Sequence, residues 1–115
     1  MTKRIRQVLR GLGFRPDMVG FMYLEQAVTI WKPGDMICKD IYPVIARNNK
    51  ATIGAVERAV RFVIRDAWDW GRYNTGVVFA VFGLWALDTR PTAGQTIAAV
   101  AVYAKDGRGG EEVED

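Results

Sequence analysis

The chain has 115 residues, of which 50% are hydrophobic and 25% charged, a length and composition typical of one globular domain. It contains no histidine and one cysteine, Cys38, which excludes histidine-based catalysis, an internal disulfide and multi-cysteine metal sites. Its longest apolar run, residues 77–87, is too short to cross a bilayer, and no secretory signal is present. We therefore expect a cytoplasmic protein that needs no metal or cofactor.

The net charge of +3 is unevenly distributed along the chain. Residues 105–115 carry two basic and five acidic side chains, whereas residues 1–104 carry 14 basic and eight acidic ones. A basic body favours a polyanionic partner, most often nucleic acid. We expect residues 1–104 to form the folded domain and residues 105–115 to be a disordered acidic tail.

Apolar residues recur at helical spacing along nearly the whole chain, and alternating strand patterns are scarce. With glycine and proline as stop signals, this spacing predicts six helices, over residues 2–12, 17–31, 36–48, 53–70, 73–83 and 92–104. Pro43 lies inside the third of these, where a proline either bends a helix or marks its first turn. The predicted fold class is an all-α single domain of six helices.

The predicted helix over residues 53–70 separates its side chains onto two faces. At about 100° per residue, Val56, Val60, Val63 and Ala67 fall within an arc of about 60°, which is a core-facing stripe. The opposite side is small or charged and comprises Gly54, Glu57, Arg58, Arg61 and Arg65. Thr52 stands where it can cap the helix.

A charged helix face is usually just solvated, but three features favour DNA as its partner. The cations are arginines, which form the bidentate contacts that guanine accepts. The residues nearest the helix start, Gly54 and Ala55, are small and allow that end to approach a groove floor. A short helix over residues 36–48 precedes this helix across a short break, which is the helix-turn-helix arrangement.

Four stretches of the chain, GFMYLEQAV, ICKDIYPVIARNNKAT, AVERAVRFVIRDAW and TRPTAGQTIAAVA, resemble the C-terminal effector domain of the sporulation master response regulator of endospore-forming bacteria. The resemblance covers residues 5–104, and its most specific pieces are the Tyr-Pro of IYPVIA, the VERAVR run and the Arg-Pro-Thr before the last helix. It implies a helical domain with a helix-turn-helix that binds double-stranded DNA at a box close to TGTCGAA and activates or represses promoters.

The resemblance also implies which side chains read bases. The family's Glu-Arg pair and its next arginine fall on Glu57, Arg58 and Arg61, and Arg65 lies next along the same face. An arginine can donate hydrogen bonds to guanine, whereas Glu57 can accept one from cytosine or simply orient Arg61. We expect this helix to lie in the major groove.

Two positions of the same helix depart from the family pattern. Ala55 stands where an arginine is common, and Phe62 stands where a histidine is common. Phe62 either contacts a thymine methyl group or turns into the core. The predicted base-reading set is therefore completed by Gly54, Ala55 and Phe62, and we expect an altered or weaker box.

Contacts to DNA phosphates are expected from Lys39, Arg47, Lys50 and Thr52, together with the amide groups at the helix start. The resemblance implies two further partners, the sigma factor of RNA polymerase and a second copy of the chain on tandem boxes. The region that touches sigma factor in the family is longer and more apolar here, so its contact residues do not carry over. Because no receiver domain precedes the resemblance, we expect a standalone protein.

Two other functions compete with DNA reading. A protein-interaction module without a receiver domain would compete for sigma factor or a partner regulator through residues 77–87 and bind DNA weakly, although we expect this run to pack in the core. An enzyme is disfavoured, because helix-end salt bridges explain Asp66 and Asp69 and we expect Cys38 to be buried and inert. Packing rather than base stacking is expected of the aromatic residues Trp68, Trp70 and Tyr73.

Overall fold

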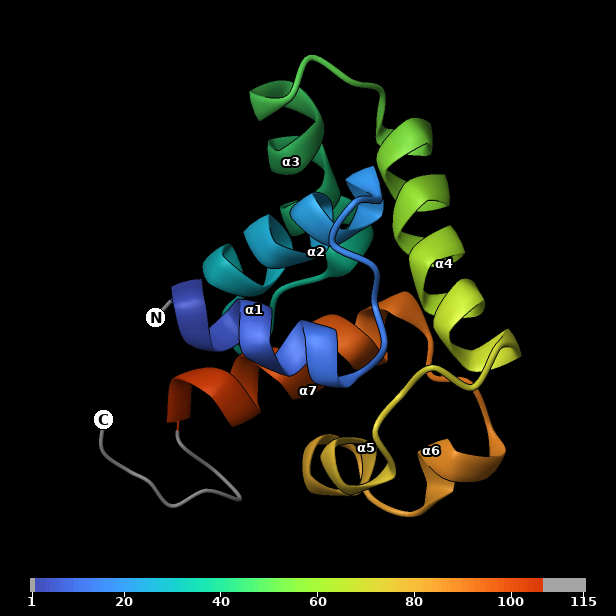
Figure 1. Cartoon of the computed structure of the whole chain (residues 1–115). Coiled ribbons are helices and arrows are strands. Elements are labelled where there is room, and N and C mark those ends of the chain that lie inside the picture. Colours follow the sequence, from blue (N-terminus) through green and yellow to red (C-terminus); the bar gives the residue numbers. More distant parts are fainter. Residues whose placement is uncertain (1, 107–115) are drawn as a thin grey trace.

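The computed structural model describes residues 2–106, and that range consists of helices joined by loops, without a strand (Figure 1). In chain order the elements are α1 (Thr2–Gly11), α2 (Val19–Ile30), the π-helical turn η1 (Ile37–Ile41), α3 (Tyr42–Asn48), α4 (Ile53–Asp69), α5 (Thr75–Val81), α6 (Trp85–Asp88) and α7 (Ala93–Asp106). The all-α prediction is confirmed. The prediction of six helices is wrong, because the described range holds seven α-helices as well as η1. None of these helices is long and apolar enough to cross a membrane.

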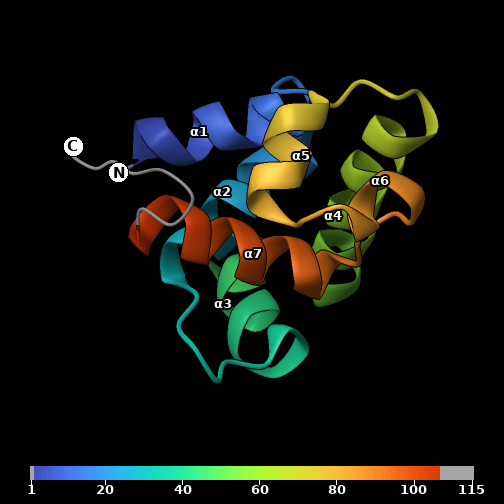
Figure 2. The same cartoon turned by 90° about the horizontal axis from the view of Figure 1, so that it is seen from below.

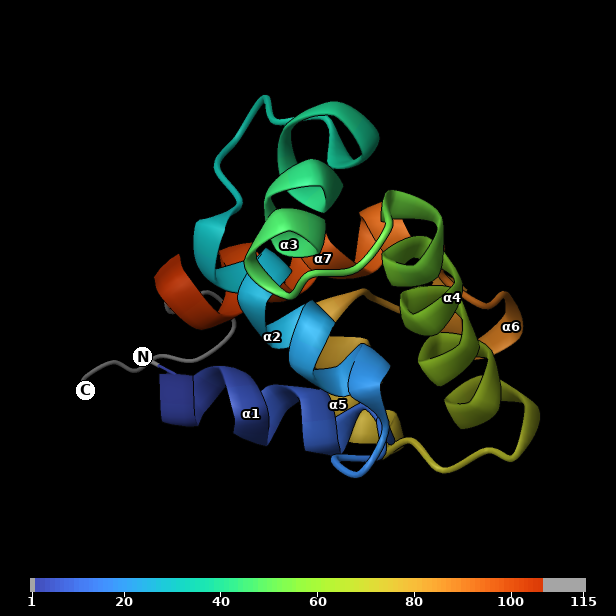
Figure 3. The same cartoon turned by 90° about the horizontal axis from the view of Figure 1, so that it is seen from above.

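Helix α2 lies at the centre of the fold. It packs against α1, α3, α4 and α7, and its Leu24, Ala27 and Val28 are fully buried. Seen from above, α3 and α4 stand side by side (Figure 3). Seen from below, α5 lies between α1 and α7 (Figure 2). The core around α2 therefore supports one side of α4 and leaves its other side open.

The predicted helix over residues 36–48 is divided into η1 and α3. Helix α3 has Pro43 in its first turn, where the missing N–H of proline has no helical partner to lose. Pro43 therefore marks a first turn, which is one of the two predicted outcomes. The expectation that Cys38 is buried is wrong: η1 turns Ile41 into the core and leaves Cys38 exposed.

The predicted helix over residues 73–83 is shorter than expected and is followed by α6, which the sequence pattern did not predict. Asn74 caps α5 by accepting a hydrogen bond from the Val77 N–H at 3.1 Å. Gly83 ends this segment with a φ of 102°, a conformation that favours glycine. The apolar run 77–87 thus becomes two short helices joined by a tight turn.

Core packing was expected for this apolar run and is only partly found. Val78 and Ala86 are buried, but Phe79, Leu84 and Trp85 are 56%, 67% and 41% exposed. Phe79 is exposed because α5 is a short helix at the edge of the domain, where it packs against α1, α6 and α7. Leu84 and Trp85 lie at the start of α6, a helix of four residues.

Helix α7 extends two residues beyond its predicted end. The Lys105 ammonium group donates hydrogen bonds to the carbonyl oxygens of Thr29 and Trp31 at 3.0 and 2.9 Å, which fixes this end of α7 beside the end of α2. Lys105 and Asp106 are therefore helical and do not belong to a disordered tail. The rest of the predicted tail, residues 107–115, lies outside the described residues.

The far end of α4 is held by aromatic packing. The Trp68 ring lies 4.8 Å from that of Tyr73, and its indole N–H donates to the Ala86 carbonyl oxygen at 2.8 Å, which ties α6 to α4. The predicted packing role is confirmed for Trp68 and Tyr73. It is wrong for Trp70, which follows the last residue of α4 and is exposed.

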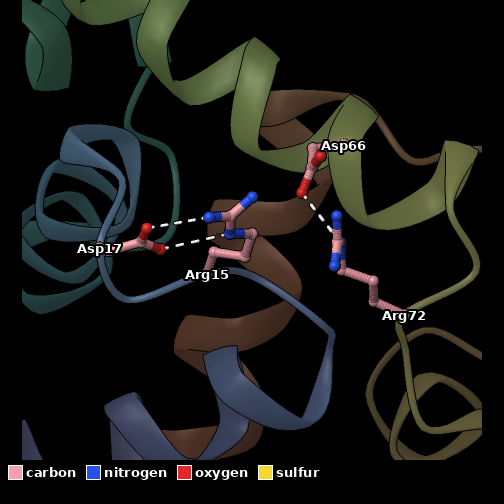
Figure 4. A network of polar contacts seen from close by, with 4 residues as sticks. All are labelled: Arg15, Asp17, Asp66 and Arg72. Atoms are coloured by element: carbon pink, nitrogen blue, oxygen red, sulfur yellow. Dashed lines mark hydrogen bonds and ion pairs between the residues drawn. The ribbon is translucent and has the colours of Figure 1, made fainter.

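Figure 4 shows two neighbouring ion pairs, one within the α1–α2 loop and one that joins α4 to the segment after it. Arg15 binds Asp17 with its guanidinium 2.9 Å from the carboxylate, and Arg72 binds Asp66 at 3.2 Å. The hydrogen bond from Arg15 holds the pKa of Asp17 below its ordinary value. Asp66 pairs with Arg72, and Asp69 pairs with Arg90 at 3.5 Å. The two aspartates of α4 thus form the salt bridges expected of them.

Candidate nucleic-acid interface

The turn between α3 and α4 is fixed by local hydrogen bonds. The Thr52 hydroxyl oxygen accepts a bond from the Ala55 N–H at 3.0 Å, as predicted for the helix cap. The Asn49 amide donates to the carbonyl oxygen of Ile45 and to the side chain of Gln26 in α2, both at 2.7 Å. Lys50 completes the turn with a φ of 54°, in the left-handed region. These hydrogen bonds and the conformation of Lys50 fix the orientation of α4 relative to α3.

Helix α4 has one buried and one exposed face, as its spacing predicted. Its buried residues are Val56, Val60, Val63, Ile64 and Ala67. On the other side Arg58, Arg61, Phe62 and Arg65 are exposed, whereas Gly54, Ala55 and Glu57 are partly buried. We call these seven residues the reading face. Its exposed members lie on the side of α4 opposite to the residues that the helix buries.

Two contacts within the reading face orient its side chains. The Glu57 carboxylate lies 3.4 Å from the Arg61 guanidinium, one helical turn further on, a position from which Glu57 can orient Arg61. The Arg65 guanidinium lies over the Phe62 ring, 5.7 Å from its centroid, within the range of a cation–π contact. Phe62 is 50% exposed, which excludes the alternative that it turns into the core.

Gly54 and Arg58 form a close pair at the start of α4. A Cβ atom at Gly54 would lie 3.3 Å from the Arg58 guanidinium. The Arg58 side chain therefore folds back along the helix toward its N-terminus, which is the usual direction of long helical side chains. This brings the guanidinium to the end of α4 that a helix-turn-helix inserts first into the groove.

The expected phosphate-binding residues lie on both ends of α3. Arg47, Lys50 and Thr52 are exposed around the turn, and Lys39 is exposed on η1 at the opposite end. Ile53, at the first position of α4, is 46% exposed beside this turn, and the sequence pattern did not single it out. No signal in the periodicity separates a first-turn residue from the stripe above it.

An amphipathic helix with an arginine face, held behind a short helix by a capped turn, defines a helix-turn-helix DNA-binding domain. Residues 5–103 match the protein family described as the C-terminal domain of the sporulation initiation factor Spo0A. The chain belongs to this family, and the resemblance seen in its sequence is confirmed. It is a DNA-binding effector domain of the sporulation-regulator type.

Proposed function

We propose that the chain is a sequence-specific transcription regulator that reads double-stranded DNA by inserting α4 into the major groove. The observation that carries this proposal is the reading face itself. Arg58 and Arg61 are both exposed on the same side of α4, so two planar groups that can form bidentate contacts with guanine face outward together. Such binding places the protein with the nucleoid in the cytoplasm.

The distribution of the other cations supports the same orientation on DNA. With α4 in the groove, Arg47 and Lys50 lie beside one phosphate backbone and Lys39 lies further along α3 and η1. Each phosphate that they neutralise steepens the dependence of log affinity on log salt by about 0.9. These contacts position the protein but carry no base information.

Selection from a pool of randomised duplexes tests sequence-specific reading without assuming a box. We expect a guanine-containing box to be enriched and its preference at one base pair to be relaxed for the Arg58→Ala variant. Lys32→Ala, which removes an exposed cation from the α2–η1 loop, is the control and should leave the enriched box unchanged. If no sequence is enriched over the starting pool, the proposal is wrong.

The exposed apolar residues of α5 and α6 support a second role as a protein contact. Phe79, Leu84 and Trp85 are all exposed, and α5 and α6 lie on the side of the domain away from α3 (Figure 1). Its partner in this proposal is sigma factor or a second copy of the chain on tandem boxes. A Leu84→Asp variant should bind a single box normally but lose sigma-factor binding or cooperative binding to paired boxes. If the variant keeps both sigma-factor binding and cooperative binding to paired boxes, this surface is not the contact site.

A further inference from the structure

A cavity of about 380 Å³ lies where η1, the middle of α4 and the start of α7 meet. Figures 1 and 3 both show the orange start of α7 beside α4. Its apolar wall is made by Ile37, Ile64 and Pro91, and its polar groups include Tyr42, Arg61 and Arg90. We call this cavity the α7 pocket. Only Glu57 and Arg61 of the reading face line it, and none of the expected phosphate-binding residues does.

The hydroxyl group of Tyr42 is buried at this pocket without a partner. Tyr42 is only 2% exposed, and its hydroxyl has no hydrogen bond to any described residue. The side chains that act on it electrostatically are Cys38, Glu57 and Arg61, and all three line the pocket. The buried hydroxyl therefore lies beside residues that line the pocket. Burial raises the pKa of Tyr42 to about 12, so at neutral pH it is a hydrogen-bond donor.

The start of α7 supplies a second set of donors. Thr92 caps the helix: its hydroxyl oxygen accepts from the Gln95 N–H at 3.1 Å, and its own N–H donates to the Gln95 side chain at 2.9 Å. The amides of Ala93 and Gly94 precede the first full turn and have no carbonyl partner within the helix. Both residues line the pocket. A helix N-terminus of this length carries partial positive charge and favours anions.

Two guanidinium groups add full positive charge at the mouth of the pocket. Arg61 and Arg90 are each bound to a carboxylate only loosely, at 3.4 Å to Glu57 and 3.5 Å to Asp69. Asp69 is not among the residues that line the pocket, and Glu57 is the one carboxylate that lines it. Each guanidinium thus has one carboxylate beside it at a long distance, and the amides at the start of α7 add partial positive charge to the pocket.

From this geometry we infer that the α7 pocket binds a phosphate group, held by Arg61, Arg90, the Ala93 and Gly94 amides and the Tyr42 hydroxyl. Two sources can deliver such a group: a small phosphorylated compound, or a backbone phosphate of DNA beside α4. Either source would draw Arg61 away from Glu57, so occupancy of the pocket is coupled to the reading face. This inference does not require α4 to read bases.

Amide chemical shifts of the ¹⁵N-labelled chain test the pocket directly. Inorganic phosphate is titrated at constant ionic strength in one arm, and an unlabelled duplex is added in the other. A phosphate site predicts shifts at Gly94 and Ala93 in at least one arm. Shifts with inorganic phosphate identify a free phosphate compound as a source, whereas shifts with the duplex alone identify the DNA backbone. No shift at either residue in both arms overturns the inference.

Two variants separate a built site from diffuse attraction to positive charge. Arg90→Gln and Tyr42→Phe should each weaken binding in the responding arm by about tenfold, the effect of one lost hydrogen bond to a charged group. Arg6→Gln, which removes a cation from α1 outside the pocket lining, is the charge-matched control and should change the affinity little. Unchanged affinity in both pocket variants overturns the inference. Because Arg90 is exposed, its variant remains informative even if Tyr42→Phe fails to fold.

Discussion

Gly20 of α2 and Ala59 of α4 approach so closely that no side chain fits between their backbones. A Cβ atom at Gly20 would lie 2.8 Å from the carbonyl carbon of Ala59 and 3.1 Å from the Val63 side chain. Backbone atoms cannot give way as the end of a flexible side chain can. The contact between α2 and α4 therefore requires that position 20 carry no side chain.

Replacing Gly20 by alanine should destabilise the domain, because α2 must move away from α4. Overpacking of this kind typically costs about 1–3 kcal/mol, which exceeds the gain of about 0.5–1 kcal/mol from alanine in a helix. Gly94→Ala is the matched control: it also occupies the second position of its helix, but its Cβ would meet Ile37 at an ordinary 3.5 Å. Denaturant unfolding of both variants checks the prediction, and equal stability would contradict the close-approach argument.

Gly54→Ala should affect DNA reading without unfolding the protein. The only near neighbour of the new methyl group is the flexible end of Arg58, at 3.3 Å, and alanine favours the helix. We expect the melting temperature to be unchanged or higher, but discrimination between the enriched box and a scrambled duplex to fall as Arg58 is displaced. Competition between the two duplexes for binding measures the discrimination. Undiminished discrimination would show that the folded-back position of Arg58 is irrelevant.

Arg58 and Lys50 should differ in what their loss changes. Arg58→Ala is expected to remove about 1–3 kcal/mol of discrimination at one base pair, because a bidentate contact to guanine is lost. Lys50→Ala should weaken binding to all sequences alike and reduce the salt slope by about 0.9. Affinities on a set of single-base box variants at several salt concentrations distinguish the two. The assignment of reading and anchoring roles is contradicted if both variants behave alike.

The carboxylate of Asp17 should titrate below its ordinary pKa of 3.8 because Arg15 donates hydrogen bonds to it. The pair is present in full above the ordinary pKa and is lost as the pH falls through the lower pKa of the folded state. Carbon-detected NMR of the aspartate side chains measures the midpoint, and in Arg15→Gln it should move back up. No movement would mean that the contact in Figure 4 does not set this pKa.

The reading helix could be predicted well from sequence because its information is local. Four apolar positions at helical spacing define its buried face, and a threonine cap defines its start. The structure buries Val56 and Val60 and has Thr52 as the cap. The position of Pro43 followed from the same kind of local constraint. The directions in which Glu57 and Phe62 act were left open by the sequence, because they depend on which neighbour one turn away each side chain meets.

Features that depend on distant contacts were mispredicted or missed. The exposure of Phe79 follows from the position of α5 at the edge of the fold, which the apolar run alone does not reveal. Cys38 was expected to be buried because free cysteines usually are, but it lies on the exposed side of η1. The α7 pocket joins Tyr42 to Arg90, and only the packing of α7 against α4 brings these residues together.

The measurement that tests the central claim most directly is fluorescence anisotropy of the chain on a duplex carrying TGTCGAA and on a scrambled duplex, at two salt concentrations. If the reading face reads bases as we propose, the family's box should bind more tightly than the scrambled duplex. Specific recognition typically gives a gap of about 4 kcal/mol or more, and Ala55 in place of an arginine should reduce it by about 1–3 kcal/mol. That gap should persist as salt lowers both affinities. Equal affinities for the two duplexes, falling together with salt, would contradict reading of this box. Failure to enrich any sequence from the randomised pool would then contradict sequence-specific reading altogether.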